Sequence, residues 1–553
     1  MATPHTATEA AAYREAYRPQ LSFSPSRNWM NDPNGMVYHD GEYHLFYQYN
    51  PHASVWGDMS WGHAVSTDLL HWRELPVALM IEKDARGEIT QSFFSGSAVV
   101  DVTNSSGLGS AAQPAMVAVY TSVYPQARTL ANGRHVLAGQ QSQSLAYSLD
   151  RGRSWTQYAG NPVLALPPEK YHDEYRDFRD PKVFWYAPDS KWVMVAVVAL
   201  RHTAVLYSSK DLIHWEFMSE FGPAGAVGGV WECPDLFELP LDDDAANSKW
   251  VLVINLNPGG PAGGSGAQYF VGRFDGKTFR ADAAAVAPAA SAAQAAPLAA
   301  AGSGQAVVAT TRPGEAVHWL DHGPDFYAAV TWNGVPDGRR VLIGWMSNWQ
   351  YATRVPTTRW RSAQSLPREL ALRRIDGQVR LVQRPVRGLE QLRRELLVAI
   401  ATLRLAPGDV ALTQTPSVSR APFDIEMLLD PGSAAQAGVK VHIGAGGEQT
   451  VVGYDRARGE VFIDRRRSGD AAFDPAFAAR HAVRVPLRAG AIRLRILVDT
   501  ASVTVFAGAH EATLTSQVFP AEGSDGLALF ADGGQATVRD MHVWSLDSIW
   551  PAR

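Results

Sequence analysis

Short alternating or apolar runs, separated by turn residues, fill the chain up to about residue 370, and convincing helical periodicity is nearly absent there. The run at 36–38 leads to a second run at 42–48 across Asp40-Gly41, a dipeptide that favours the positive φ of a tight hairpin turn. The same pattern predicts four more hairpins. They join 94–97 to 116–120, 183–186 to 191–198, 236–239 to 250–256, and 326–332 to 340–345.

A polar motif introduces each of these five hairpins. The motifs contain Asn31 and Asp32, Ser95, Arg179 and Asp180, Glu232, and Asp325. Small antiparallel sheets repeated around an axis form a β-propeller, whose strands start beside a central channel. We therefore predict an all-β fold with a five-bladed propeller over residues 18–372, and we expect the five motifs to line one mouth of its channel.

Three further segments complete the predicted organisation. Residues 281–307 are nearly all alanine, which predicts either a surface loop or a short exposed helix, without a catalytic role. The pattern turns helical and basic at about 383–400, so we predict a linker with a short helix over 373–400. Strands then return with even spacing, which predicts a C-terminal β-sandwich over 401–553. They are expected at 423–429, 439–443, 460–463, 492–498, 502–506 and 526–530.

Composition excludes several classes of protein. The net charge of −5 over 553 residues argues against a nucleic-acid partner, and no apolar run approaches the roughly 20 residues that span a bilayer. Cys233 is the single cysteine, so no intrachain disulfide can form. The N-terminus shows no signal peptide, which predicts a cytoplasmic protein, or an extracellular or periplasmic one if a signal was removed.

Asp32, Asp180 and Glu232 each lie in a short motif that contains proline. The motifs are WMNDPNG at 29–35, RDP at 179–181 and ECP at 232–234. Each alone is more typical of a turn or a surface ion pair, but carboxylates at equivalent strand entrances can converge. Cleavage of a sugar acetal uses one acid that protonates the leaving oxygen and one carboxylate that attacks. The three acids therefore suggest a glycosidase. The 17 tryptophans fit either sugar stacking or a strand-rich core.

These motifs resemble those of glycoside hydrolase family 32, the β-fructofuranosidases, which include invertases, inulinases and levanases. The resemblance extends from about residue 21 to the C-terminal strands and implies a five-bladed propeller followed by a β-sandwich. It also rests on FYQYNP at 46–51, WGHA at 61–64, FSGS at 94–97 and GWM at 344–346.

The resemblance implies a role for each acid. Asp32 would be the nucleophile, Glu232 the general acid and base, and Asp180 the residue that stabilises the transition state. It also implies a pocket for the terminal fructosyl ring, formed by Asn31, Gln48, Trp56, Phe94, Ser95, Arg179 and Trp349. Neighbouring amides are expected to keep Asp32 ionised, and an apolar setting beside Trp231 to keep Glu232 protonated.

No cofactor and no metal is expected, because acetal hydrolysis needs only carboxylates and water. Four histidines show no spacing suited to a metal and are predicted to be structural. They are His39, His44, His63 and His71.

Within the family, the segments 140–148, 229–236 and 453–455 look most like those of exo-acting levanases and inulinases. We therefore predict a retaining exo-β-fructosidase that releases fructose from inulin, levan, sucrose and fructo-oligosaccharides. Two alternatives stay open: a fructosyltransferase that makes fructo-oligosaccharides from sucrose, and a catalytically silent fructan-binding protein. The preferred linkage and the oligomeric state also stay open.

Overall fold

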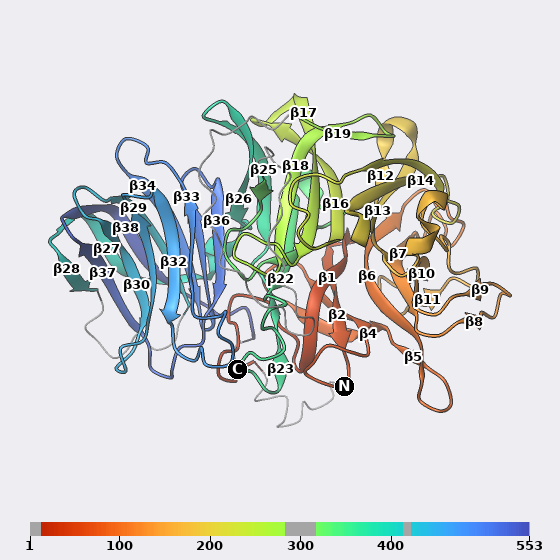
Figure 1. Cartoon of the computed structure of the whole chain (residues 1–553), viewed down its shortest axis with the longest axis horizontal. Helices are drawn as coiled ribbons and strands as arrows, with labels where there is room; N and C mark the ends of the chain where they lie inside the picture. The colour runs from red at the N-terminus through yellow and green to blue at the C-terminus, as the bar shows by residue number, and fades with distance from the viewer. Residues whose placement is uncertain (1–12, 283–316, 413–421, 552–553) are drawn as a thin grey trace.

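The structure is a computed structural model that describes residues 13–282, 317–412 and 422–551, and it is almost entirely β-sheet (Figure 1). The predicted alanine-rich insert lies outside the described residues except for Ala281 and Asp282, and so do residues 1–12, on which the prediction about a signal peptide depended. Among the residues described, no helix has both the length and the apolar character needed to cross a bilayer.

Three sheets come first along the chain, and all their strand pairs are antiparallel except that of β1 with β23, which is parallel. The first consists of β1 (Asn28–His39), β2 (Glu42–Asn50), β3 (Ser60–Ser66), β4 (Arg73–Leu79) and the short β23 (Trp360–Arg361). The second consists of β5 (Glu82–Lys83), β6 (Ile89–Asp101), β7 (Ala115–Tyr124), β10 (Gln140–Ser148) and β11 (Thr156–Gln157), and β8 (Arg128–Thr129) pairs with β9 (His135–Val136) nearby. The third consists of β12 (Phe178–Tyr186), β13 (Lys191–Val198), β14 (Thr203–Ser209) and β15 (Glu216–Phe221).

A ten-stranded sheet follows, and a single parallel residue pair, Leu241 with Leu372, joins its two halves. One half holds β16 (Val230–Leu241), β17 (Asp244–Asn257), β18 (Gly266–Phe274), β19 (Phe279–Ala281) and β20 (His318–Trp319). The other holds β21 (Tyr327–Thr331), β22 (Arg340–Met346), β24 (Ala363–Gln364), β25 (Arg368–Ile375) and β26 (Gln378–Pro385). If the ten-stranded sheet is divided at this pair, and the two-stranded β8–β9 sheet is set aside, this part of the described chain contains five sheets, which is the predicted number of blades.

All five predicted hairpins are confirmed as antiparallel pairs: β1 with β2, β6 with β7, β12 with β13, β16 with β17, and β21 with β22. Asp40 and Gly41 have φ values of 48° and 86°, the positive φ expected of this turn. The acidic loop between β16 and β17 is shorter than predicted, because the two strands stay paired as far as Leu241 and Asp244.

The C-terminal part is a β-sandwich of two six-stranded sheets, which stands beside the propeller in Figure 1. One sheet holds β27 (Arg393–Leu405), β29 (Phe423–Asp430), β34 (Ile492–Asp499), β35 (Ser502–Ala507), β36 (Ala512–Gln517) and β38 (Ala536–Leu546). The other holds β28 (Gly408–Ala411), β30 (Gln436–Ile443), β31 (Gln449–Asp455), β32 (Glu460–Arg467), β33 (Arg480–Arg484) and β37 (Gly526–Asp532). Their inner faces share one apolar core, as alternation of apolar residues predicts for packed sheets. All six predicted sandwich strands are present.

The short helix that was predicted in the linker over 373–400 is present only as a 3₁₀ turn, and most of the segment with the helical and basic pattern forms strands. This region contains the end of β26, one turn of 3₁₀ helix at Leu389–Leu392, and the start of β27. Pairing of β27 with β38 decides its conformation, because neighbouring strands outweigh local propensity. The domain limits at 372 and 400 stay a prediction. The other 3₁₀ helices of the described chain are η1 (Glu169–Glu174), η2 (Ala187–Asp189), η3 (Ala199–Arg201) and η4 (Pro336–Gly338).

Buried polar contacts fix the sandwich against the propeller. The Arg465 guanidinium from β32 lies 2.6 Å from a carboxylate oxygen of Asp325, and both side chains are fully buried. Tyr351 donates a hydrogen bond of 2.6 Å to the other oxygen of the same carboxylate. Asp325 was predicted to lie at the channel mouth with the other motifs. That prediction is wrong, because both oxygens of the Asp325 carboxylate are bound in the contact between the propeller and the sandwich.

Candidate active site

One pocket of about 360 Å³ contains every residue that was predicted for the site. These are Asn31, Asp32, Gln48, Trp56, Phe94, Ser95, Arg179, Asp180, Glu232 and Trp349. They come from β1, β2, β6, β12 and β16, and from the loops that follow β2 and β22. The innermost strands of four blades therefore meet at this mouth of the channel.

A β-bulge stands at the pocket in each of these innermost strands. Pairing with the neighbouring strand shifts register between Met30 and Pro33 in β1, between Arg179 and Lys182 in β12, and between Glu232 and Asp235 in β16. The same shift occurs in β6 across Ser95 and in β21 just after Tyr327. A bulge bends the strand and turns a side chain out of the normal alternation. This repeated irregularity aims the acids at a common centre.

The prolines of the three motifs fit these bulges. Proline has no N–H to donate to a sheet ladder, and within sheets it is confined to edges, strand starts and bulges. Pro181 and Pro234 lie within the shifted segments, and Pro33 is the first residue of β1 to pair again after its shift. Two of the residues just before a proline, Asp180 and Cys233, have positive φ values of 62° and 43°. For residues other than glycine this conformation is strained, and it is concentrated at functional sites.

Asp32 is held by three donors. Ser95 Oγ donates to its Oδ2 at 2.7 Å, Asn31 Nδ2 to its Oδ1 at 3.0 Å, and the Cys233 thiol lies 3.6 Å from Oδ2. Burial nevertheless raises the pKa of Asp32, and the nearby charge of Glu232 raises it further. The expected amide donor Asn31 is present and, with Ser95, lowers the pKa of Asp32, but the larger effect of burial leaves that pKa raised.

Glu232 lies in a polar setting, not in the apolar one predicted from its sequence neighbours. Its Oε1 accepts hydrogen bonds from Arg179 Nε and Nη2 at 3.3 Å and 3.2 Å. Tyr327 Oη donates to its Oε2. Trp231, in contrast, is fully buried and donates to the backbone oxygen of Ala226. The neighbours of Glu232 in space therefore come from other strands.

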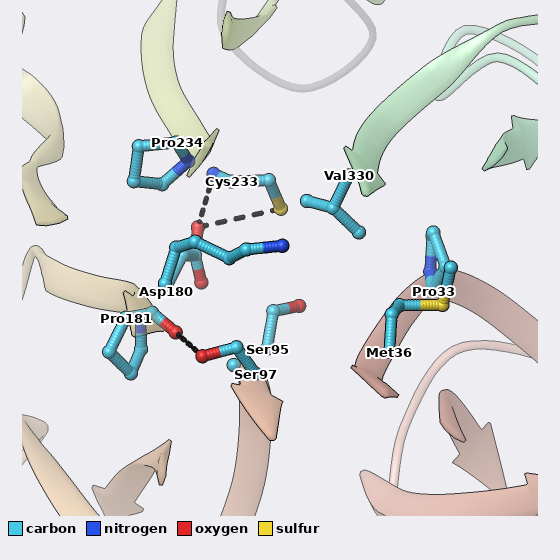
Figure 2. A pocket seen from close by; sticks show the side chains of 11 residues that line it. Pro33, Met36, Ser95, Ser97, Asp180, Pro181, Cys233, Pro234 and Val330 are labelled. Atoms are coloured by element: carbon cyan, nitrogen blue, oxygen red, sulfur yellow. Dashed lines mark hydrogen bonds between the residues drawn. The ribbon is translucent and has the colours of Figure 1, made fainter. Parts of the chain in front are cut away.

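Asp180 is anchored between two blades. Its backbone N–H donates to Thr121 Oγ1 at 2.9 Å, and its Oδ2 accepts from the Cys233 backbone N–H at 2.9 Å. Figure 2 shows Cys233 directly above the Asp180 carboxylate. Burial raises the pKa of Asp180, Arg179 opposes the rise, and Glu232 adds to it.

Two tryptophans give the pocket its aromatic walls. Trp56 is 48% exposed and meets Phe94 edge-on, with ring centroids 6.1 Å apart. Trp349 stacks on Trp29 at 5.8 Å, and the Trp29 indole donates to Asn31 Oδ1 at 2.8 Å. Trp56 therefore presents a free apolar face at the rim, while Trp29 packs behind the pocket and orients Asn31. Trp29 therefore fills the core, and sugar stacking stays a prediction for the exposed Trp56.

Five residues of the site were not predicted. Gln141, Asp177, Val230 and Asn257 line the pocket, and Tyr327 contacts Glu232 from β21. Arg179 Nη1 donates to Asp177 at 3.2 Å and to Gln141 at 3.4 Å. Gln141 lies in the 140–148 segment that carried the resemblance, and Asp177 stands two residues before Arg179. Tyr327 gave no signal in the sequence beyond its place in a hairpin.

The described residues contain no group of three or more histidine, cysteine, aspartate or glutamate side chains that could hold a metal ion. His44 and His63 are buried and contact each other, with 3.0 Å between ring nitrogens.

A β-propeller with a β-sandwich beside it, and a pocket at the channel mouth that gathers carboxylic acids and exposed indole, are features of enzymes that cleave glycosides. The chain belongs to glycosyl hydrolase family 32: the N-terminal domain of that family matches residues 22–385 and its C-terminal domain matches residues 389–545.

Individual relatives are similar over nearly the whole chain. The chain is 44% identical to an extracellular exo-inulinase of Aspergillus awamori, over 98% of this chain and 97% of that one. It is 44% identical to a levanase of Bacillus subtilis (strain 168), over 100% of this chain and 73% of the other. The crystal structure of the exo-inulinase from Aspergillus awamori superposes with a TM-score of 0.87 at 43% identity, covering 97% of this chain and 100% of that one.

Proposed function

We propose that this protein is a retaining exo-β-fructosidase, which hydrolyses terminal β-D-fructofuranosyl residues of inulin, levan, sucrose and fructo-oligosaccharides and releases fructose. The observation that carries the proposal is the convergence of Asp32, Asp180 and Glu232 on one pocket from three different blades. The similarity to an exo-inulinase and to a levanase supports the substrate class.

In the proposed mechanism Asp32 attacks the anomeric carbon and forms a covalent fructosyl intermediate. Ser95 and Asn31 hold its two oxygens, so the carboxylate is oriented before the sugar arrives. Glu232 protonates the departing oxygen and then, as the base, activates the water that releases fructose. Arg179 and Tyr327 fix both oxygens of Glu232.

Asp180 is proposed to bind hydroxyls of the fructosyl ring. Its Oδ2 accepts the Cys233 backbone N–H, and its carboxylate lines the pocket. Hydrogen bonds that strengthen as the ring flattens toward an oxocarbenium ion stabilise the transition state by several kcal/mol. Arg179 lies beside Asp180, with 3.9 Å between Nε and Oδ2, and limits the repulsion among the acids.

A blind pocket supports attack at chain ends. Ser95 and Asp180 line the pocket and also a second space directly behind it, which measures only about 10 Å³ (Figure 2). Pro33, Met36 and Val330 close that space. A sugar polymer cannot thread through such a site, so the terminal ring enters and the rest of the chain stays outside.

The test is a time course on sucrose, inulin and levan with products separated by chromatography, with Asp32→Ala as the inactive control. Fructose as the sole early product of the polymers is the expected result. Short oligosaccharides appearing first would contradict the exo mode, and longer products from sucrose would identify a fructosyltransferase. Polymer binding without turnover by the unaltered protein would identify a silent fructan-binding protein.

A further inference from the structure

A buried ion pair lies directly behind the pocket, between Lys182 of β12 and Asp235 of β16. Lys182 Nζ is 3.0 Å from Asp235 Oδ2, and the two side chains are 4% and 0% exposed. Lys182 Nζ also donates to the backbone oxygen of Thr331 at 2.5 Å, and the Thr331 N–H donates to Asp235 Oδ2 at 2.6 Å. Neither charged residue lines the pocket itself. One charge cluster thus joins the innermost strands of three blades.

These residues stand where the strands return to regular pairing after their bulges. Lys182 is the first residue of β12 to pair with its neighbouring strand after the register shift, and Asp235 is the first in β16. Thr331 lies one residue beyond the corresponding point in β21. The cluster therefore fixes the relative heights of three bulges, those that bring Asp180, Glu232 and the β21 segment to the pocket.

Stability alone is a poor explanation for this pair. Two charges lose their hydration on burial, and apolar residues of similar volume often serve as well or better. Asp235 Oδ1 has no hydrogen-bond partner among the described residues, which adds to the cost. Unlike an apolar contact, however, an ion pair with hydrogen bonds has a preferred distance and direction. It resists sliding of one strand along another.

We propose that Lys182 and Asp235 are positioning residues for the reaction, which set the spacing between Asp180 and Glu232. Sliding of β12 against β16 would act first on the 2.9 Å bond between Asp180 Oδ2 and the N–H of Cys233, the residue after Glu232. A misplacement of about 1 Å in a catalytic constellation can cost about 10²-fold in rate. This inference rests on the proposed function.

The decisive variant is the double substitution Lys182→Met and Asp235→Leu, which removes both charges together. We expect it to keep the wild-type thermal midpoint, or to exceed it, while kcat on sucrose falls at least about 10-fold and KM changes less than about threefold. The single substitution Asp235→Asn keeps the shape of the side chain but leaves Lys182 without its counter-charge. It is expected to lower both kcat and the thermal midpoint.

A second readout separates positioning from a merely structural role. The charge of Glu232 raises the pKa of Asp32 and of Asp180 after the larger effect of burial. A changed spacing between the acids therefore moves the acid limb of the pH profile of kcat/KM. Loss of folded protein would lower the whole profile without moving it.

The matched control is a second buried ion pair, Arg368 with Asp321, whose charged atoms are 2.9 Å apart and whose side chains are 0% and 1% exposed. Replacing it with Met and Leu should change stability but not kcat per folded molecule or the pH profile. Wild-type kcat in the folded Lys182→Met/Asp235→Leu variant would overturn the inference. The inference would also be overturned if no variant of Lys182 and Asp235 folded, because the ion pair would then be needed for folding itself. Wild-type turnover is measured first, so that failure of the proposed function is seen separately.

Discussion

The hydrogen bond from Ser95 to Asp32 allows the sharpest test of the proposed nucleophile. Ser95 Oγ lies 2.7 Å from Asp32 Oδ2. Burial and the charge of Glu232 raise the pKa of Asp32, and this hydroxyl is the largest of the hydrogen bonds that oppose the rise. The substitution Ser95→Ala removes the donor and should therefore raise the pKa of Asp32 further.

The size of this shift follows from the strength of the bond. A hydrogen bond to a charged group contributes about 1.5–3 kcal/mol, and one pH unit corresponds to about 1.4 kcal/mol. Complete loss of the bond should therefore raise the pKa of Asp32 by about 1–2 pH units. Asn31 and Cys233 still contact the carboxylate. We therefore expect a shift at the lower end, about one unit toward higher pH.

The assay is kcat/KM on sucrose against pH, because its acid limb reports the group that must be ionised in the free enzyme. Sucrose does not titrate in this range, so the limb belongs to the protein. Ser97→Ala is the matched control, since Ser97 is also buried in β6 but bonds to the backbone of Pro181 and Val183 instead. An acid limb that stays in place in Ser95→Ala, or moves equally in Ser97→Ala, would refute the reasoning.

Three further predictions use other parts of the structure. Glu232→Ala should lower kcat on sucrose by about 10²–10⁴, because the departing oxygen is then left without its proton donor; wild-type turnover of sucrose by this variant would argue against the acid–base role. Trp56→Ala should raise KM for inulin several-fold with kcat nearly unchanged, because it removes an exposed ring face at the rim; an unchanged KM would exclude stacking. Arg465→Met leaves Asp325 buried and unpaired and should cost about 3–5 kcal/mol of unfolding free energy in urea; an unchanged midpoint would contradict this.

The sequence was sufficient for the propeller because its signals are local. Asp40-Gly41 and similar turns follow from the conformations that single residues permit, and pairing within a hairpin needs no distant partner. The conformation of residues 383–400 could not be predicted from local signals, because β27 pairs with β38, which lies more than 130 residues later in the chain. The prediction that Asp325 lies at the channel mouth was wrong for a related reason. Its position before a hairpin matched that of the other motifs, but its side chain is bound by Arg465 from the sandwich.

The predicted site residues gather in one pocket, but the environment predicted for Glu232 differs from the one observed, and this contrast has a physical cause. Most of the ten predicted residues that line the pocket belong to a bulge or a loop whose position the strand order dictates, and Gln48 lies on β2 opposite the bulge of β1. Their electrostatics were judged from sequence neighbours such as Trp231, whose side chain packs elsewhere. In a propeller, adjacent side chains on a strand point to opposite faces, so the contacts of a channel residue come mainly from other blades.

The pocket gathers four acids, Asp32, Asp177, Asp180 and Glu232, around one guanidinium, Arg179. Burial together with repulsion among these acids raises the pKa of both Asp32 and Asp180. The charge of Asp32 is among those that raise the pKa of Asp180, so a proton held by these two acids belongs to the pair. A retaining glycosidase needs one carboxyl protonated while another is ionised. Asp32 and Asp180 therefore retain a proton more readily than isolated carboxyls would, and in the proposed mechanism Glu232 is the acid that protonates the departing oxygen.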